Sequence, residues 1–437
     1  MPSAFINDLP PEILASILEI VAGGNAWANN TTLPLLSSIC SHWREVLLGH
    51  PQLWTKLYCA ISNKLRNEPD PLISNLIAHL QSWYARAGNL PLELILDFTV
   101  TPRHTNSLYS YLIAQSKWRS LSFANDSAAT TSSWVWLQDL IRAARNSYDE
   151  NDERPCWPGL ETLIISSPRV VYEGKRPLVL PLKLIAPNLR KIELTFLYLR
   201  SPPCPVFNDM PWTSLTHFKL TGTLEVFDIS FPFHVLREAP NLKDLRILFR
   251  RWYSRQPEGM CPSLAVPLCH RNLQHLALLL HCDGTIPFLQ SVRLPSLRSL
   301  DLSTAAMVPP TEIGLHPLGD AIQLLVSHSK CEIQSLRLQR MPNTAAEVHG
   351  ILAALPALQS VELIRAGCIW GHNRNKHNSP DEFFRILQED GSALPVIRNF
   401  SYIGRGESTY TVQEGVTDFD LFRAFPLDWF MKKKGRC

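Results

Sequence analysis

The apolar positions of the chain recur in a pattern of three, Leu-x-x-Leu-x-Leu, in which Ile, Val or an aromatic residue can replace Leu. The second and third positions are two residues apart, so their side chains point to the same face of a β-strand. Each copy therefore predicts a short strand with one buried face. Eight clear copies begin at Leu160, Leu189, Leu215, Leu242, Leu273, Leu297, Ile333 and Leu358, and weaker copies begin at Trp118 and Ile397.

A proline stands two residues before five of these copies, at Pro158, Pro187, Pro240, Pro295 and Pro356. Because the residue before proline avoids the helical region, a helix arriving from the preceding repeat ends there. Residues 232–239 are predicted to form such a helix. A strand with one return element cannot bury its apolar face alone, so neighbouring repeats must stack into one continuous core.

The clear copies begin 24 to 36 residues apart, and most steps lie near the period of about 20–29 residues of leucine-rich repeats. The region therefore resembles the leucine-rich repeats seen in F-box proteins. The Asn or Cys that this family usually has three residues after the last Leu is missing, which predicts an irregular solenoid. The alternative is a mixed α/β domain with unrelated strands. The residues at that position are Pro168, Leu197, Thr223, Arg250, His281, Ala305, Met341 and Ala366.

The first sixty residues carry a different period, that of the α-helix. Apolar residues at positions 13, 14, 17, 18 and 21 form one stripe of a helix that Gly23 and Gly24 end. We expect a polar loop at 22–32, a second helix at 34–48 and a short helical turn at 50–54. Three helices in about 50 residues make a core too small to be secure alone, so this unit is expected to complete its burial against a partner.

These N-terminal residues resemble the F-box in order, spacing and identity. The matching elements are Leu9-Pro10-x-Glu12-Ile13-Leu14-x-x-Ile17-Leu18, then Ile39-Cys40-x-x-Trp43-Arg44, then Pro51-x-Leu53-Trp54. The loop at 22–32 is longer than in compact F-boxes. The resemblance implies docking to the Skp adaptor of a Skp–cullin–F-box ubiquitin ligase; the alternative is a generic three-helix cap. The residues expected to bind Skp are Leu9, Pro10, Ile13, Leu14, Ile17, Ile39, Cys40, Trp43, Arg44, Pro51, Leu53 and Trp54.

Between the two regions, residues 73–87 have helical periodicity and residues 92–98 alternate like a strand. We therefore divide the chain into an F-box at 1–60, a linker helix at 61–90, a degenerate leucine-rich-repeat solenoid at 91–403, and a C-terminal cap with a basic tail at 404–437. The fold class is α+β or α/β, with three N-terminal helices followed by the solenoid.

The strand positions that alternate with the buried ones are expected to line one open face of the repeats. Their mixed charge suits a protein or peptide target better than a nucleic acid, although ordinary solvated strand residues would look the same. These candidate target-binding residues are Lys191, Glu193, His217, Lys219, Asp244, Arg246, His275, Asp301, Arg337 and Glu362.

The net charge of +3 includes four basic residues among the last six, Lys432, Lys433, Lys434 and Arg436. Removing them leaves −1 for the rest of the chain, which gives no support for nucleic-acid binding. No stretch is apolar enough to span a membrane, and the N-terminus lacks a signal-peptide pattern. Ten dispersed cysteines without a C-x-x-C motif indicate reduced thiols. We expect an intracellular protein, cytoplasmic or nuclear.

Candidate catalytic chemistry is sparse. The sequence has no P-loop, no Gly-x-Ser-x-Gly and no Gly-x-Gly-x-x-Gly. Two groups, Cys368/His372/His377 and Cys261/Cys269/His270/His275, lack the tight paired spacing of zinc ligands, so we expect neither a metal nor another cofactor. The sequence predicts an adaptor rather than an enzyme: the F-box binds Skp, and through it a cullin, and the repeats bind a target protein. The alternatives are a scaffold without ligase output and, less favoured, a metal-dependent enzyme.

Overall fold

The structure is a computed structural model of the chain. It describes residues 9–23, 29–61, 71–98, 106–124, 135–150, 153–167, 180–199, 207, 209–224, 230–251, 267–279, 282–303, 317–339, 345–364, 397–403 and 409–412. Its contacts divide the chain into two compact units, Met1–Leu215 and Thr216–Cys437. Both are mixed α/β structures built on a parallel sheet. The division lies inside the region 91–403 that was predicted as one solenoid.

The first unit opens with helices α1 (Pro11–Gly23), α2 (Asn29–Ile39) and α3 (Ser41–Leu48) and the 3-10 helix η2 (Pro51–Trp54). The single helix predicted at 34–48 is wrong, because the chain is extended at Cys40, with φ −155° and ψ 170°. The Cys40 Sγ accepts a hydrogen bond from the backbone N–H of Trp43 at 3.4 Å and so caps α3. The loop predicted at 22–32 is also too long, since α2 begins at Asn29.

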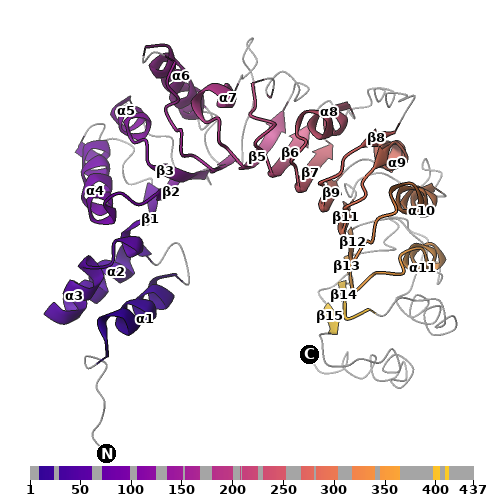
Figure 1. Cartoon of the computed structure of the whole chain (residues 1–437), viewed down its shortest axis with the longest axis horizontal. Helices are drawn as coiled ribbons and strands as arrows, with labels where there is room; N and C mark the ends of the chain where they lie inside the picture. Colours follow the sequence, from indigo (N-terminus) through magenta and orange to yellow (C-terminus); the bar gives the residue numbers. More distant parts are fainter. Residues whose placement is uncertain are drawn as a thin grey trace, which may run out of the picture. The chain divides into compact units, whose positions relative to one another are not determined.

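Five parallel strands follow in the first unit: β1 (Lys56–Ile61), β2 (Leu92–Phe98), β3 (Trp118–Ala124), β4 (Thr162–Ser167) and β5 (Lys191–Leu199). The connections carry α4 (Pro71–Ala87), α5 (Asn106–Ala114), α6 (Val135–Glu150) and α7 (Leu182–Ile185). These helices lie on one face of the sheet (Figure 1).

Strand β1 is missing from the sequence prediction. It pairs in parallel with β2, with Leu57 opposite Leu94 and Cys59 opposite Leu96. The helix predicted at 73–87 is present as α4, and Gly88, with φ +62°, ends it in the left-handed conformation that glycine adopts readily. Because α4 connects two adjacent parallel strands, it is the crossover of the first β-α-β unit, not a linker between separate parts.

The second unit has seven parallel strands among its described residues: β6 (His217–Leu224), β7 (Asp244–Arg251), β9 (His275–Leu279), β11 (Ser299–Ser303), β12 (Ser335–Gln339), β13 (Ser360–Ile364) and β14 (Asn399–Ile403). The strand β15 (Thr409–Val412) pairs antiparallel with β14. The helices α8 (Ser230–Glu238), α9 (Cys282–Gln290), α10 (Pro317–Ser329) and α11 (Ala345–Ala353) cover one face, and a small parallel pair joins β8 (Leu268–Cys269) to β10 (Val292–Arg293).

The repeated apolar positions build the core, as the sequence predicts. Every copy of the pattern, weak ones included, coincides with a parallel strand. The second position of five successive copies forms one ladder from β7 to β13, and each of its side chains is at most 1% exposed. Its members are Leu245, Leu276, Leu300, Leu336 and Val361. Burying each such side chain contributes about 1.5–3 kcal/mol, so lateral stacking supplies the stability that one repeat lacks.

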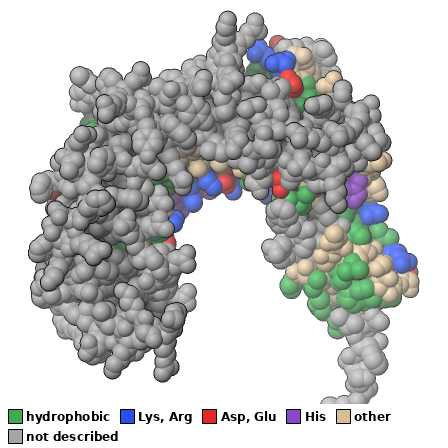
Figure 2. Space-filling view, turned by 180° about the vertical axis from the view of Figure 1, so that it is seen from behind, with side chains coloured by type: hydrophobic (Ala, Val, Ile, Leu, Met, Phe, Trp, Pro, Cys, Tyr) green, Lys and Arg blue, Asp and Glu red, His purple; other side chains and the backbone are tan. Residues whose placement is uncertain are grey.

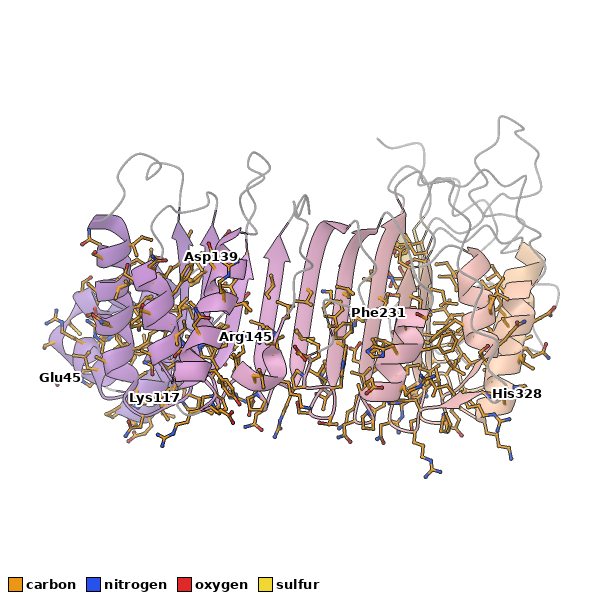
Figure 3. All side chains as sticks on the ribbon, turned by 90° about the horizontal axis from the view of Figure 1, so that it is seen from above. Glu45, Lys117, Asp139, Arg145, Phe231 and His328 are labelled. Carbon is orange, nitrogen blue, oxygen red and sulfur yellow. The ribbon has the colours of Figure 1, made fainter. Side chains whose placement is uncertain are left out.

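The connections are irregular. The helices between strands range from 4 residues in α7 to 17 in α4, so the strands stay in register while the opposite side varies. Figure 3 shows the helices in front of the strands, with Lys117, which precedes β3, at the edge where the strands begin. None of the described helices is both long and apolar enough to cross a membrane.

Candidate functional sites on the N-terminal helices and the strand face

Large apolar side chains are exposed mainly on the three N-terminal helices. Among the described residues, seven large hydrophobic side chains are exposed, and six of them lie on α1, α2 or α3 at 48% to 76% exposure. A concentration of exposed apolar side chains is typical of surfaces that bind another molecule. We call it the helical surface; its residues are Ile13, Ile20, Val21, Leu35, Ile39 and Leu48.

Helix α1 is apolar on two sides. Leu14 and Leu18 are buried, on the side where α1 packs against α2 and α3. Ile13 and Ile20 lie on the other side, 50% and 76% exposed. The stripe predicted from the sequence therefore combines a buried and an exposed row. One row completes the helical core, and the second is available to a partner.

The residues predicted to bind Skp fall into three groups in the structure. Leu14, Leu53 and Trp54 are buried within the chain, where they support the helices from inside. Leu9, Ile17, Cys40 and Trp43 are half-buried, and Pro10, Ile13, Ile39, Arg44 and Pro51 are exposed.

The sequence prediction also missed exposed members of the helical surface: Ile20, Leu35 and Leu48 were not singled out, and Val21 was assigned only to the stripe. For α1, the sequence does carry a signal for such exposed residues, because the helix has more apolar residues than one buried stripe requires.

Trp54 holds the N-terminal helices onto the sheet. Its indole Nε1 donates a hydrogen bond of 2.9 Å to the carbonyl of Leu47 at the end of α3. Its ring centroid lies 4.8 Å from that of Trp83 on α4, in an edge-to-face arrangement. The guanidinium carbon of Arg86 lies 4.4 Å from the Trp54 ring centroid, at cation–π distance. Trp54 thus supports the helical surface from behind.

Arg44 fixes the α2–α3 corner. Its Nε donates a hydrogen bond of 3.0 Å to the carbonyl of Ser37, one of the orphan carbonyls at the end of α2. Together with the Cys40 cap, this contact gives Cys40 and Arg44 local structural roles.

The ten predicted target-binding residues lie on strands, at positions that alternate with the buried ladder. In the first unit, Lys191 and Glu193 lie on β5 and form an ion pair of 2.8 Å. The other eight lie in the second unit, in two neighbouring rows set by the register. One row is His217, Asp244 and His275, and the other is Lys219, Arg246, Ala277, Asp301, Arg337 and Glu362.

The charges of this second row are largely paired within the chain. Arg246 donates to Asp244 through Nε and Nη2, each at 2.9 Å from a carboxylate oxygen. Arg337 lies between two carboxylates, with Nε 3.1 Å from Glu362 Oε2 and Nη1 3.6 Å from Asp301 Oδ2. Figure 2 shows basic and acidic side chains interspersed rather than segregated. These residues are therefore brought together as predicted, but as ion pairs more than as free charges.

Asp301 is the most perturbed carboxyl of this row. Burial raises its pKa above the ordinary value, and the neighbouring Glu362 raises it further. Arg337 and Arg246 oppose the shift, and the small Ala277 side chain separates Arg246 from Asp301 in the row. The carboxylates and arginines around Asp301 therefore influence its charge through space.

The described histidine and cysteine side chains that are buried in the core include His270, Cys59 and Cys331. The His270 Nε2 bonds the carbonyl of Ala239 at 2.9 Å, and its Nδ1 accepts from the Leu273 N–H at 3.2 Å. Burial raises the pKa of Cys59 to about 12 and that of Cys331 to about 11, which keeps both thiols protonated. The described residues contain no group of three or more possible metal ligands; Cys261 and Cys368/His372/His377 lie outside them.

A scan against protein-family models finds no match to the chain, and a search of curated proteins finds no similar sequence.

Proposed function

We propose that this protein is the target-recognition adaptor of a Skp–cullin–F-box ubiquitin ligase. In this proposal, residues of α1–α3 form an F-box that binds the Skp adaptor, and the parallel sheet is a degenerate leucine-rich-repeat solenoid that binds a target protein. Catalysis of ubiquitin transfer belongs to other subunits of the complex. The chain raises the effective concentration of the target near them, in the cytoplasm or the nucleus.

The observation that carries the proposal is the concentration of exposed apolar side chains on α1–α3. Six of the seven exposed large hydrophobic side chains among the described residues lie there. Leaving them in water forgoes stabilisation of about 25 cal/mol per Å² of apolar area, and a partner that covers them recovers it. The F-box-like motif lies on the same helices, so the sequence resemblance and the exposure favour the same surface.

The sheet supports the second half of the proposal. Its strands keep a continuous register while the connections vary in length, which is the organisation expected of stacked repeats. Its outward positions carry mixed charge, which favours selectivity in protein recognition more than raw affinity.

The test is co-purification of the Skp adaptor with the full chain. The double substitution Ile13→Asp and Ile39→Asp puts charges on two exposed positions of neighbouring helices, where a docked partner would bury them without compensation. We expect the Skp adaptor and its cullin to be lost from the purified complex. Folding should be retained, because exposed substitutions usually change stability by only about 0.5 kcal/mol.

The matched control is Leu90→Asp. Leu90 is the seventh exposed large hydrophobic residue among those described, and it follows α4 rather than lying on α1, α2 or α3. Skp should co-purify with this variant as it does with the wild type. Undiminished Skp binding by the Ile13/Ile39 variant, with an unchanged circular dichroism spectrum, would refute the adaptor assignment. Skp binding without a cullin would favour the scaffold.

A further inference from the structure

The second unit has a row of polar residues at the edge where its strands begin. One residue immediately before each of six successive strands contributes to it, and the backbone joins them in order. After the first member, each N–H donates to the carbonyl of the preceding member at 2.8–2.9 Å, so the six stack one above another. We call this the strand-start row; its residues are Lys243, Gln274, Arg298, Gln334, Gln359 and Arg398.

The strand-start row contains cations and amides but no carboxylate. Lys243, Arg298 and Arg398 are exposed, and none of them forms an ion pair within the part of the chain that the structure describes. Figure 3 shows long side chains extending past the edge where the strands begin. The row thus differs from the neighbouring strand face, where Arg246 and Arg337 are paired.

The corresponding positions of the first unit are arranged differently. Arg119, Glu161 and Arg190 occupy them, joined by the same backbone bonds of 2.9 Å. There Glu161 lies within the row and pairs with Arg119 at 3.1 Å. A strand-start row of unneutralised cations is therefore a property of the second unit's described residues, not of the repeat geometry itself.

A line of hydroxyl groups adjoins the strand-start row on the open face. Ser299, Ser335 and Ser360 are the first residues of β11, β12 and β13 and lie opposite one another in register. All three are half-buried. Each hydroxyl can donate a hydrogen bond to an anion. In register this line continues through His275 to Asp244, whose carboxylate is paired with Arg246. From β11 to β13, the two adjoining lines therefore offer side-chain donors without a side-chain carboxylate between them.

We propose that the strand-start row binds an acidic, extended segment of a partner protein that crosses the starts of β7 to β14. The identification of that partner as the ligase target rests on the function proposed above; the binding itself does not. Cation–carboxylate hydrogen bonds at Lys243, Arg298 and Arg398 would supply the charge-assisted contacts. The glutamines between them would bind the peptide backbone.

The glutamines favour a peptide over a nucleic acid. A glutamine amide donates and accepts, which matches the N–H and C=O groups of an extended peptide, whereas a phosphodiester backbone presents acceptors alone. Glu332 is also exposed, two residues before Gln334 at the same edge. A continuous polyphosphate would meet repulsion there, while a peptide can place a neutral residue at that point.

The spacing of the cations gives the register of the segment. Neighbouring strands lie about 4.8 Å apart and an extended peptide rises about 3.3 Å per residue. Lys243 and Arg298 are two strand steps apart, about 10 Å, or about three peptide residues. Arg298 and Arg398 are three steps apart, about 14 Å, or about four residues. The matching segment has carboxylates at relative positions of about 0, 3 and 7.

The experiment uses the purified full chain and a fluorescent peptide with aspartates at that spacing. The comparison peptide has the same composition with the three aspartates contiguous. Fluorescence anisotropy should show tighter binding of the spaced peptide, weakened by added salt. The variant Lys243→Gln/Arg298→Gln/Arg398→Gln should bind it about tenfold or more weakly. The control Arg119→Gln/Arg142→Gln, which removes two paired cations of the first unit, should change binding less than about twofold.

The outcomes separate this inference from the proposed function. Wild-type Skp binding by the triple variant, with peptide binding lost, supports the row regardless of ligase output. Equal binding of the two peptides, or loss of binding only in the Arg119/Arg142 control, would overturn the proposal. Tighter binding of a single-stranded oligonucleotide than of the spaced peptide, through the same three residues, would also overturn the proposal.

Discussion

The N-terminal helices and the parallel sheet differ in how far their apolar side chains are buried. In the sheet, each apolar ladder is covered by helices on its own face and by neighbouring repeats on its sides; Leu276 is 1% exposed. On α1, Leu14 is covered but Ile20, six residues later, is 76% exposed. A stack of repeats buries its own apolar surface, whereas three short helices cannot enclose theirs. This difference is the basis for proposing the helices as a docking surface.

Charged side chains also differ between two parts of the sheet. The described face of the sheet pairs Arg246 and Arg337 with carboxylates, whereas the cations of the strand-start row form no ion pair with the described residues. The paired charges are already partly neutralised within the chain, whereas the cations of the strand-start row are not. The two proposed docking regions are therefore those where the chain leaves its own apolar area or its own charge unmatched.

The largest expected effect on the free energy of unfolding comes from replacing a buried rather than an exposed apolar side chain. Leu276→Ala leaves a cavity in the core of β9 and should lower the free energy of unfolding by about 2–5 kcal/mol. Ile20→Ala, on the uncovered side of α1, should change it by only about 0.5 kcal/mol. Urea denaturation of both variants measures the difference. Equal losses would contradict the contrast between the two regions.

A smaller effect is expected at the junction between the regions. Trp54→Phe keeps an aromatic ring at this position but removes the indole N–H that donates to the Leu47 carbonyl. The loss of this donor should destabilise the junction by about 1–3 kcal/mol. Native-state hydrogen exchange should show faster exchange in α3 and η2 than in β9 to β13. Faster exchange spread evenly over the sheet would mean that Trp54 stabilises the chain as a whole rather than the attachment of the helices.

The sequence predicts the sheet well because the signal is periodic. Strand side chains alternate, so the spacing of Leu300 and Leu302 determines which face is buried without knowledge of the neighbours. The strand β1 escaped the prediction because Leu57, Tyr58 and Cys59 are all buried and do not alternate. The break at Cys40 escaped it because cysteine is not among the usual N-cap residues.

The candidate sites depend on contacts that periodicity does not encode. The helical period identifies α1 as apolar but does not say which side its neighbours cover, so Leu14 and Ile13 look equivalent in sequence. Arg337 meets Asp301 and Glu362 through strand register, across segments far apart in the chain. Whether a charge is free or paired therefore follows from the fold, not from the local pattern.

Hydrogen exchange of the full chain with and without purified Skp adaptor tests the central claim most directly. The account predicts slower amide exchange within residues 11–48 when the adaptor is bound, because docking restrains the helices that carry the helical surface. Exchange in β11, β12 and β13 should stay unchanged. Slower exchange in those strands without any change in α1–α3, or no change anywhere at saturating adaptor, would contradict the account.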